Sequence, residues 1–186
     1  VPIIIFLFKR TSIHWSVWPS VVLCLIGGYL LTNFYDATVR LGDSLVILGA
    51  LFWSTHIIFT GIIVNKYNLP LTLGAAQTFI VALFSFVIAF IYEEFVYLEI
   101  MKEINSILYA GILSGGFAFV LQIYAQKNIT PAPAAIIFSL EGVFATIAAW
   151  FILNQILDIN NLLGCLFILC GVLLSQLLPL VQKKYS

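Results

Sequence analysis

The amino-acid sequence predicts an all-α integral membrane protein, a polytopic bundle of transmembrane helices. Of its 186 residues, 62% are hydrophobic and only 9% are charged, and the mean hydropathy is +1.12. A soluble domain has about 25% charged residues. Six apolar runs of eighteen residues or more fit the length that crosses a bilayer core. Basic residues alternate from loop to loop, as expected for a chain that crosses the membrane repeatedly.

Residues 1–8 form an apolar stretch that is too short to span a bilayer and is followed by Lys9 and Arg10. The stretch lacks the basic start and small-residue cleavage site of a signal peptide, so we expect the end of a helix whose beginning is missing. The chain is therefore expected to be a C-terminal fragment. Six full spans are predicted after this partial one, at residues 17–34, 45–64, 71–92, 107–125, 131–153 and 161–178.

Residues at the ends of these runs support the boundaries. Trp15 and Trp18 flank the start of the first span and are typical interfacial anchors. Thr130 followed by Pro131 predicts a helix start, because the hydroxyl can cap free N–H groups and the proline gives up only an N–H that has no partner. The acidic stretch at residues 93–105 is expected to be a solvated loop or a surface helix.

Lysine and arginine residues predict the orientation. Counting from the loop after residue 8, the odd loops and the tail hold six basic residues, whereas the even loops hold two. Cytoplasmic loops are enriched in Lys and Arg. The odd loops and the tail at 179–186 are therefore predicted to be cytoplasmic, in a multi-pass protein of the inner membrane. The six are Lys9, Arg10, Lys66, Lys127, Lys183 and Lys184, and the two are Arg40 and Lys102.

Composition and motifs argue against several classes of function. A net charge of zero removes the electrostatic argument for a nucleic-acid partner. Cys24, Cys165 and Cys170 lie in apolar runs without a CxxC pattern or His pairing, so we expect small buried hydrophobes rather than a disulfide or a metal site. HExxH, paired aspartates and His/Cys groupings are missing from the sequence. We expect no enzyme, no metal and no cofactor, and proton coupling stays open.

Four predicted helices gather small and polar residues on one face, at the spacing of an α-helix. In lipid, such faces turn toward protein or a wet cavity, because an unpaired polar side chain in hydrocarbon is unfavourable. The four faces hold Gly49, Trp53, His56 and Thr60; Gly74, Gln77, Val81 and Ser85; Gly111, Gly115, Ala118, Gln122 and Gln126; and Ala134, Phe138, Glu141, Ala145 and Ala148.

Five residues of these faces are candidates for substrate, proton or gating chemistry: Glu141, His56, Trp53, Gln122 and Gln77. Most of these residues also have a simpler, purely structural interpretation. His56 could be a hydrogen-bonded core histidine, Trp53 could fill space, and Gln77 is better explained as an interhelical hydrogen-bond partner. Gln122 suits either interpretation.

Other residues of the faces are expected to serve packing. Gly111 and Gly115 form a GxxxG motif, which lets another helix approach closely, and Gly142 is expected to pack in the same way. Gln126, like Gln77, is interpreted as an interhelical hydrogen-bond partner.

Glu141 stands apart because it carries the only formal charge inside the apolar runs. It follows Thr130 by eleven residues, which at about 1.5 Å per residue places it about 16 Å into the span, near the bilayer midplane. A charge there costs about 2.5 kcal/mol or more, which packing alone does not explain. We expect a role in substrate binding, proton transfer or gating, with a structural ion-pair partner as the alternative.

A weak internal repeat relates the two ends of the chain. Residues 13–32 align without gaps on residues 156–175, which places Gly28-Tyr29-Leu30-Leu31 on Gly171-Val172-Leu173-Leu174. Repeats of this kind are typical of transporters.

Several short motifs form a recognisable set: Tyr109-Ala110-Gly111, Gln122-Ile123-Tyr124-Ala125-Gln126-Lys127, Pro131-Ala132 and Ser139-Leu140-Glu141-Gly142-Val143-Phe144-Ala145. As a set they resemble the second repeat of an EamA-type drug/metabolite transporter. Gly142 replaces the proline of that family's Leu-Glu-Pro-Val-Phe-Ala pattern, and the acid of its later Leu-Leu-Gly-Glu is absent from residues 152–155. The resemblance covers residues 42–178, and residues 1–34 resemble the tail of the first repeat.

The resemblance implies ten helices in two inverted repeats of five. Residues 1–34 would then hold the end of one helix and one whole helix of the first repeat, and residues 42–178 would be the second repeat. It also implies a secondary carrier that moves a small metabolite or drug-like solute by alternating access, most often outward. The expected partners are the lipid bilayer, the solute, the missing N-terminal repeat and, as an option, a second copy. A non-transporting assembly subunit or a pore is the alternative.

Overall fold

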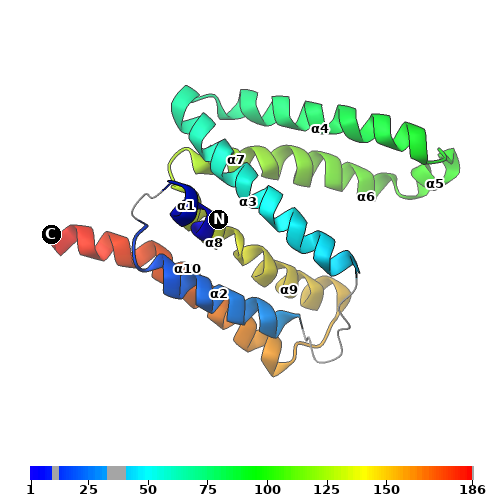
Figure 1. Ribbon diagram of the computed structural model, residues 1–186. Helices are drawn as coiled ribbons and strands as arrows, with labels where there is room; N and C mark the ends of the chain where they lie inside the picture. Colours follow the sequence, from blue (N-terminus) through cyan, green and yellow to red (C-terminus); the bar gives the residue numbers. More distant parts are fainter. Residues whose placement is uncertain (10–12, 33–40, 186) are drawn as a thin grey trace. The chain divides into compact units, whose positions relative to one another are not determined.

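The computed structural model describes residues 1–9, 13–32 and 41–185, and all regular secondary structure in these ranges is helical (Figure 1). The predicted all-α class is confirmed. In chain order the elements are α1 (Pro2–Lys9), α2 (Val17–Leu31), α3 (Leu41–Tyr67), α4 (Pro70–Tyr92), α5 (Tyr97–Lys102), α6 (Ile104–Leu108), the π-helix η2 (Tyr109–Ala118), α7 (Phe119–Gln126), α8 (Pro131–Phe138), α9 (Leu140–Leu153) and α10 (Ile159–Tyr185).

Five helical stretches of the described chain are long and apolar enough to cross a membrane, at Gly42–Tyr67, Pro70–Tyr92, Ile104–Gln126, Pro131–Leu153 and Ile159–Gln182. They correspond to the last five of the six predicted spans. The first predicted span, at 17–34, is represented by α2, which has 15 residues and a length of about 22 Å; its predicted end at 33–34 lies outside the described residues. The structure therefore supports five full spans and a shorter apolar helix.

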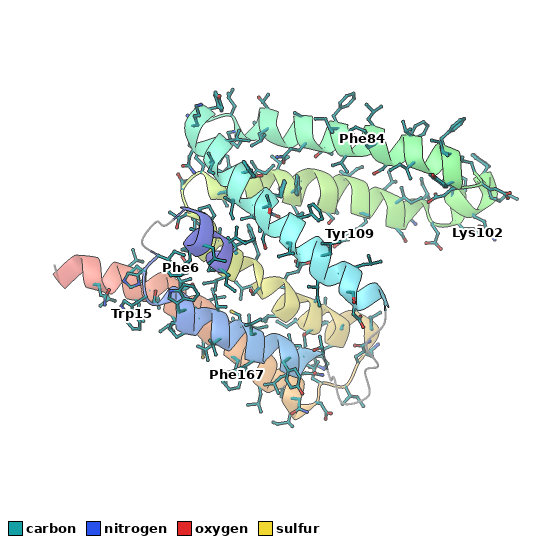
Figure 2. All side chains as sticks on the ribbon, viewed as in Figure 1. Phe6, Trp15, Phe84, Lys102, Tyr109 and Phe167 are labelled. Atoms are coloured by element: carbon teal, nitrogen blue, oxygen red, sulfur yellow. The ribbon has the colours of Figure 1, made fainter. Side chains whose placement is uncertain are left out.

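Most apolar side chains of these helices are exposed within the chain. Figure 2 shows them projecting outward, Phe84 of α4 among them. A water-soluble monomer rarely exposes so much contiguous apolar surface. Helices of this length, with all backbone hydrogen bonds made internally, suit the hydrocarbon of a bilayer. The chain is therefore a multi-pass membrane protein.

The chain divides into two compact units, which are described separately. Unit 1 comprises Val1–Ile58 and Thr130–Ser186, and unit 2 comprises Phe59–Ile129. In unit 1, α2 and α10 run side by side, and α8 and α9 pack against them (Figure 1). The core of unit 1 is a small cluster of buried aliphatic side chains, namely Ile5, Val17, Ala132, Ile136, Val143, Ile168 and Val172.

Glycines let the backbones of α2 and α10 approach closely. A Cβ atom on Gly27 would lie 2.6 Å from Ile168 Cγ1 and 2.7 Å from the carbonyl oxygen of Gly164. A Cβ atom on Gly171 would lie 2.9 Å from Cys24 Sγ and 2.9 Å from the carbonyl oxygen of Ser20. Any side chain at Gly27 or Gly171 would therefore collide with the facing helix.

These two sets of contacts are reciprocal. Gly27 and Gly171 are 144 positions apart, as are Cys24 and Ile168, and as are Ser20 and Gly164. Gly27 contacts Ile168 and Gly164, and Gly171 contacts the residues that lie 144 positions before these two, Cys24 and Ser20. A local two-fold axis between the helices produces this arrangement. This register differs by one residue from the predicted alignment, which paired Gly28 with Gly171. A Cβ atom on Gly28 would meet nothing within 4 Å.

Unit 2 consists of the end of α3, α4, and the continuous run from α6 through η2 to α7. Gly74 of α4 lies against α7, because a Cβ atom there would be 3.0 Å from Val120 Cγ2 and 3.4 Å from Ile123 Cδ1. Asn65 Nδ2 of α3 donates hydrogen bonds to the carbonyl oxygens of Gly61 (2.7 Å) and Gln126 (3.3 Å). The acidic stretch at 93–105 includes the short exposed helix α5.

The third full span departs from α-helical geometry over Tyr109–Ala118, where ten residues form the π-helix η2. In a π-helix the backbone hydrogen bonds join residues five apart. The nearest atom to a Cβ on Gly115 is accordingly the carbonyl oxygen of Ala110 in the same helix, at 3.2 Å. The predicted 3.6-residue stripe from Gly111 to Gln122 therefore does not continue straight through this segment.

The span at 131–153 begins and ends as predicted but is interrupted at Ser139. Thr130 precedes the helix in an extended conformation, and its hydroxyl makes no capping hydrogen bond. Around Ser139 the backbone N–H groups bond three residues back, Ser139 to Ile136 (3.1 Å) and Gly142 to Ser139 (3.3 Å), which separates α8 from α9. Asn154 ends α9 in the left-handed conformation (φ 51°), which asparagine tolerates at a helix end.

Candidate functional site

Glu141 lies in unit 1, two residues after the interruption at Ser139. It is the eleventh residue of the 23-residue span Pro131–Leu153, so its position in the middle of a membrane-length helix agrees with the sequence. Its side chain is exposed, whereas Val143, two residues on, is buried in the core. In the part of the chain that the structure describes, the Glu141 carboxylate has no hydrogen bond and no ion pair. The Glu141 carboxylate can therefore bind a proton or a cation, or contact a further protein segment.

Trp53 and His56 come together in unit 1 as a stacked pair on α3. Their ring centroids are 5.2 Å apart, and the ring planes differ by 24°. Trp53 is 48% exposed and His56 is half-buried. The pair presents a flat aromatic surface beside a titratable imidazole, which suits stacking with a planar or cationic solute.

Gln77 and Gln122 lie in unit 2. Gln77 Nε2 donates a hydrogen bond of 3.4 Å to Thr60 Oγ1, which joins α4 to α3. This contact matches the interpretation of Gln77 as an interhelical partner. Gln122 of α7 has a buried Nε2 atom without a hydrogen-bond partner among the described residues. The five sequence candidates thus fall into two sets, with Glu141, Trp53 and His56 in unit 1.

The three glycines expected to serve packing have different surroundings. A Cβ atom on Gly111 would meet nothing within 4 Å, and one on Gly115 would meet only its own helix. The close helix approach expected at this GxxxG motif therefore stays a prediction. A Cβ atom on Gly142 would lie 3.4 Å from Leu31 Cδ1 and 3.9 Å from Ile168 Cδ1, so Gly142 faces α2 and α10.

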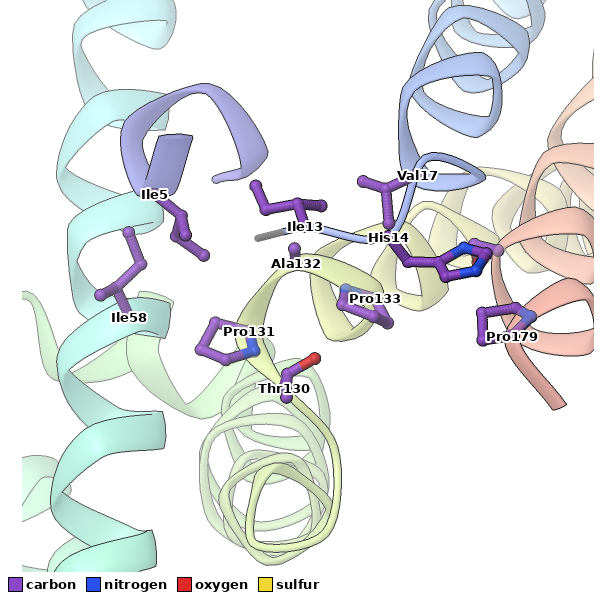
Figure 3. Close-up of a pocket in the computed structure, with 11 residues that line it drawn as sticks. Ile5, Ile13, His14, Val17, Ile58, Thr130, Pro131, Ala132, Pro133 and Pro179 are labelled. Carbon is purple, nitrogen blue, oxygen red and sulfur yellow. The ribbon is translucent and has the colours of Figure 1, made fainter. Parts of the chain in front are cut away.

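A pocket of about 440 Å³ opens in unit 1 at the start of α8 (Figure 3). Its volume falls in the range of small-molecule sites. The wall is mostly aliphatic and proline, with three polar side chains, His14, Thr130 and Ser175. Pro131 and Pro133 of α8 and Pro179 of α10 contribute rigid surfaces to it. The arrangement can hold a small amphipathic molecule.

His14 was not among the sequence candidates, yet it is the most connected polar side chain of this pocket. The backbone N–H of Ser16 donates to His14 Nδ1 (3.3 Å), and Ser16 Oγ lies 2.8 Å from the same atom. Because a backbone N–H can only donate, Nδ1 is the acceptor and the ring proton is on Nε2. Nε2 then donates to Oε1 of Gln182, which ties the start of α2 to the end of α10.

The position of His14 in a short loop explains why the sequence did not single it out. The sequence candidates all lie inside the predicted full spans, whereas His14 precedes the first of these spans. The available signal was a histidine two residues before a serine, between two basic residues and an interfacial tryptophan.

No group of three or more His, Cys, Asp or Glu side chains in the described ranges could hold a metal ion. Cys24, Cys165 and Cys170 are free thiols in α2 and α10.

Comparison with known proteins adds a family to this geometry. The model of the EamA-like transporter family matches residues 40–177. The chain is 26% identical to the uncharacterized transporter YoaV of Bacillus subtilis, over 75% of this chain and 48% of that protein. It is 28% identical to an uncharacterized transporter of Archaeoglobus fulgidus, over 95% of this chain and 56% of that protein. An auxin-induced protein of Pinus taeda is 26% identical over 78% of this chain.

The chain spans about half the length of the curated relatives that it matches. No solved structure matches it. The family match covers well over half of the chain and contains four of the five membrane-length helices whole and the last one, Ile159–Gln182, up to residue 177. The motifs around Glu141, the five apolar spans and this match agree, and the chain belongs to the EamA-like transporter family.

Proposed function

We propose that the protein is a secondary carrier that moves a small metabolite or drug-like solute across the inner membrane by alternating access, in the direction of export. In this proposal residues 42–178 are the second of two inverted five-helix repeats, and residues 1–34 end the first. The missing repeat lies N-terminal to this chain, and a homodimer is a further option. The proposal includes no catalytic chemistry and no cofactor.

The reciprocal contacts between α2 and α10 carry the proposal. The two helices lie antiparallel, since Gly27 faces Gly164 and Ser20 faces Gly171. A two-fold axis that exchanges two antiparallel membrane helices lies in the membrane plane, and such an axis relates inverted repeats. Repeats of this kind can exchange conformations, which opens a central site alternately to either side. The lengths of the relatives, about twice that of this chain, leave room for such a partner repeat.

Glu141 is proposed to bind a proton or a cationic group of the solute in turn. A carboxylate within a membrane span attracts either a proton or another cation, because both supply the positive charge that it lacks in hydrocarbon. A single site that holds either a proton or a cation couples the two by competition. Glu141 lacks a partner among the described residues, as a site that must exchange ligands requires.

The proposal is tested with the full-length protein in proteoliposomes, using a panel of labelled metabolites. A carrier accelerates uptake of a labelled solute when the vesicles are preloaded with the unlabelled one, because the return step of the loaded protein is faster. A pore shows no such acceleration, and an assembly subunit shows no uptake at all. Either of these two results would refute the carrier.

The orientation is part of the proposal. The basic loops predict a cytoplasmic C-terminus, so the start of α8 and the end of α10, which both line the pocket, would face the cytoplasm. A solute to be exported enters from that side.

A further inference from the structure

Gln126, the last residue of α7, has a buried side chain that makes no hydrogen bond within the described chain. Its exposed fraction is 1%, and neither Nε2 nor Oε1 has a hydrogen-bond partner there. One helical turn earlier, Gln122 also has a buried Nε2 atom without a partner. Two carboxamides at positions i and i+4 lie on one face of a helix. Three polar atoms are therefore gathered on this face of α7 without hydrogen bonds.

The Gln126 backbone is anchored independently of its side chain. Its carbonyl oxygen accepts the hydrogen bond from Asn65 Nδ2, at 3.3 Å. Gln77, in the same unit, shows how a glutamine that serves packing behaves, because its amide reaches Thr60 Oγ1 on the neighbouring helix. The expectation that Gln126 joins two helices through its side chain is not met by the described residues.

A buried polar group without a partner destabilises the folded protein, so such groups are uncommon and call for a ligand, a water molecule or a second conformation. An apolar side chain of similar size would fill the same volume without this penalty. The glutamine at position 126 is thus unfavourable for packing alone, which points to a role in binding.

We propose that Gln126 and Gln122 form a binding site for a neutral planar amide group of the transported solute. This inference rests on the proposed carrier function and names the chemical class of its substrate. The Gln126 carboxamide offers one donor face and one acceptor face, so it forms two parallel hydrogen bonds with a primary amide, a lactam or an imide. Gln122 Nε2 donates a third hydrogen bond to the carbonyl oxygen of the same group.

The balance of donors and acceptors selects an amide over a carboxylate. A carboxylate can accept hydrogen bonds from Nε2 of Gln126 and Nε2 of Gln122, but it has no proton to donate to Oε1 of Gln126. A buried oxygen without a hydrogen-bond donor is unfavourable. Exchanging the positions of oxygen and nitrogen in the Gln126 amide does not alter this, because both atoms lack partners. Glutamine also does not titrate, so this site recognises the solute, while Glu141 carries the charge that couples transport.

The test uses the purified full-length protein and measures thermal unfolding with and without matched pairs of ligands: glutamine against glutamate, asparagine against aspartate, and nicotinamide against nicotinate. The variants are Gln126→Leu, Gln122→Leu and, as a control, Gln77→Leu, which makes the same replacement at a glutamine that has a partner. Transport of any stabilising ligand is then measured in proteoliposomes.

We expect Gln126→Leu to unfold at the same temperature as the parent protein or higher, and Gln77→Leu to unfold at a lower temperature. At least one amide should stabilise the parent and the Gln77→Leu variant, and its acid counterpart should not. The same amide should bind Gln126→Leu about tenfold more weakly or worse, because polar groups left unpaired discriminate strongly. Gln122→Leu should show a smaller loss.

Three results would overturn the inference. If Gln126→Leu unfolds at a lower temperature, as the control does, a protein group pairs the amide and no ligand is needed. If no amide stabilises the parent protein, or an acid does so equally well, the substrate class is wrong. If the amide effect persists in Gln126→Leu, the site is elsewhere. Each of these leaves the carrier function standing, since accelerated exchange of another solute would still establish it.

Discussion

Gly164 of α10 lies directly against the backbone of Gly27 of α2: a Cβ atom on Gly164 would be 2.8 Å from the carbonyl oxygen of Gly27. Separations below 3.0 Å are essentially never seen for real Cβ atoms. Only glycine on both helices permits this approach, which is the role that small residues have in membrane helix pairs. Ile168 also lies against Gly27, and its counterpart Cys24 lies against Gly171.

Gly27→Ala is expected to destabilise the protein, because the new methyl group meets backbone atoms of α10 that cannot turn away. Overpacking of this kind typically costs about 1–3 kcal/mol. Gly28→Ala is the matched control: a Cβ atom there meets nothing within 4 Å, and alanine favours the helix by about 0.5–1 kcal/mol. Thermal unfolding in detergent should show a lower midpoint for the first variant and an unchanged or higher one for the second. Equal midpoints would contradict the close contact.

Glu141→Gln is expected to spare folding and abolish transport that depends on a pH gradient. The carboxylate is exposed and makes no hydrogen bond in the described structure, so the charge contributes little to stability within this chain. The glutamine keeps the shape and loses the exchangeable proton. Transport is measured in proteoliposomes with and without an imposed pH gradient.

Glu141→Ala should give the same transport defect with some loss of stability. Unfolding temperatures are measured on the same preparations as a control for folding. Wild-type transport by Glu141→Gln would show that Glu141 is neither a proton carrier nor an essential charge. Failure of this variant to fold would instead favour an ion-pair partner elsewhere in the protein.

The hydrogen bond between His14 and Gln182 is expected to hold the end of α10 against the loop before α2. A double-mutant cycle with His14→Ala and Gln182→Ala should give a coupling energy of about 1 kcal/mol, the usual net value of a neutral hydrogen bond. The measurement is the free energy of unfolding of the four proteins. If the two substitutions change the free energy of unfolding additively, the two side chains do not interact in the membrane.

The loop charges make a topological prediction. A reporter fused after Ser186 should be cytoplasmic, and one inserted near Glu99, in the exposed helix α5, should be external. Reporters that are active only in one compartment distinguish the two sites. A periplasmic C-terminal reporter would reverse the whole assignment.

Hydrophobicity and end signals were sufficient to predict the five long spans. The predicted span at 131–153 has the bounds of the observed one, because Thr130-Pro131 begins a helix and the apolar run ends at Leu153. The interruption at Ser139 was not foreseen, since no proline marks it. The π-helix was not foreseen either. Its residues are ordinary apolar and small ones, and a periodicity argument assumes the 3.6-residue turn from the outset.

The site was less accessible to sequence reasoning, because side-chain partners depend on tertiary contacts. Gln77 and Gln126 carry the same amide and received the same interpretation, yet only Gln77 has a partner in the described structure. The repeat register was one residue off because Gly27 and Gly28 are adjacent, and only the contacts show which of them faces α10. His14 cannot be predicted from its local sequence, because its hydrogen-bond partner Gln182 lies 168 positions away.

The π-helix at Tyr109–Ala118 also has a consequence for how this family can change length. Removing one residue from an α-helical membrane span turns everything beyond the deletion by about 100°, which exchanges lipid-facing and protein-facing surfaces. A π turn contains one residue more than the α turn it can become. If one residue of η2 is deleted, a π turn can become an α turn. The helices α6 and α7 then keep their present orientation about the helix axis. Single-residue gaps among related proteins are expected to cluster in this segment and to be rare in α4.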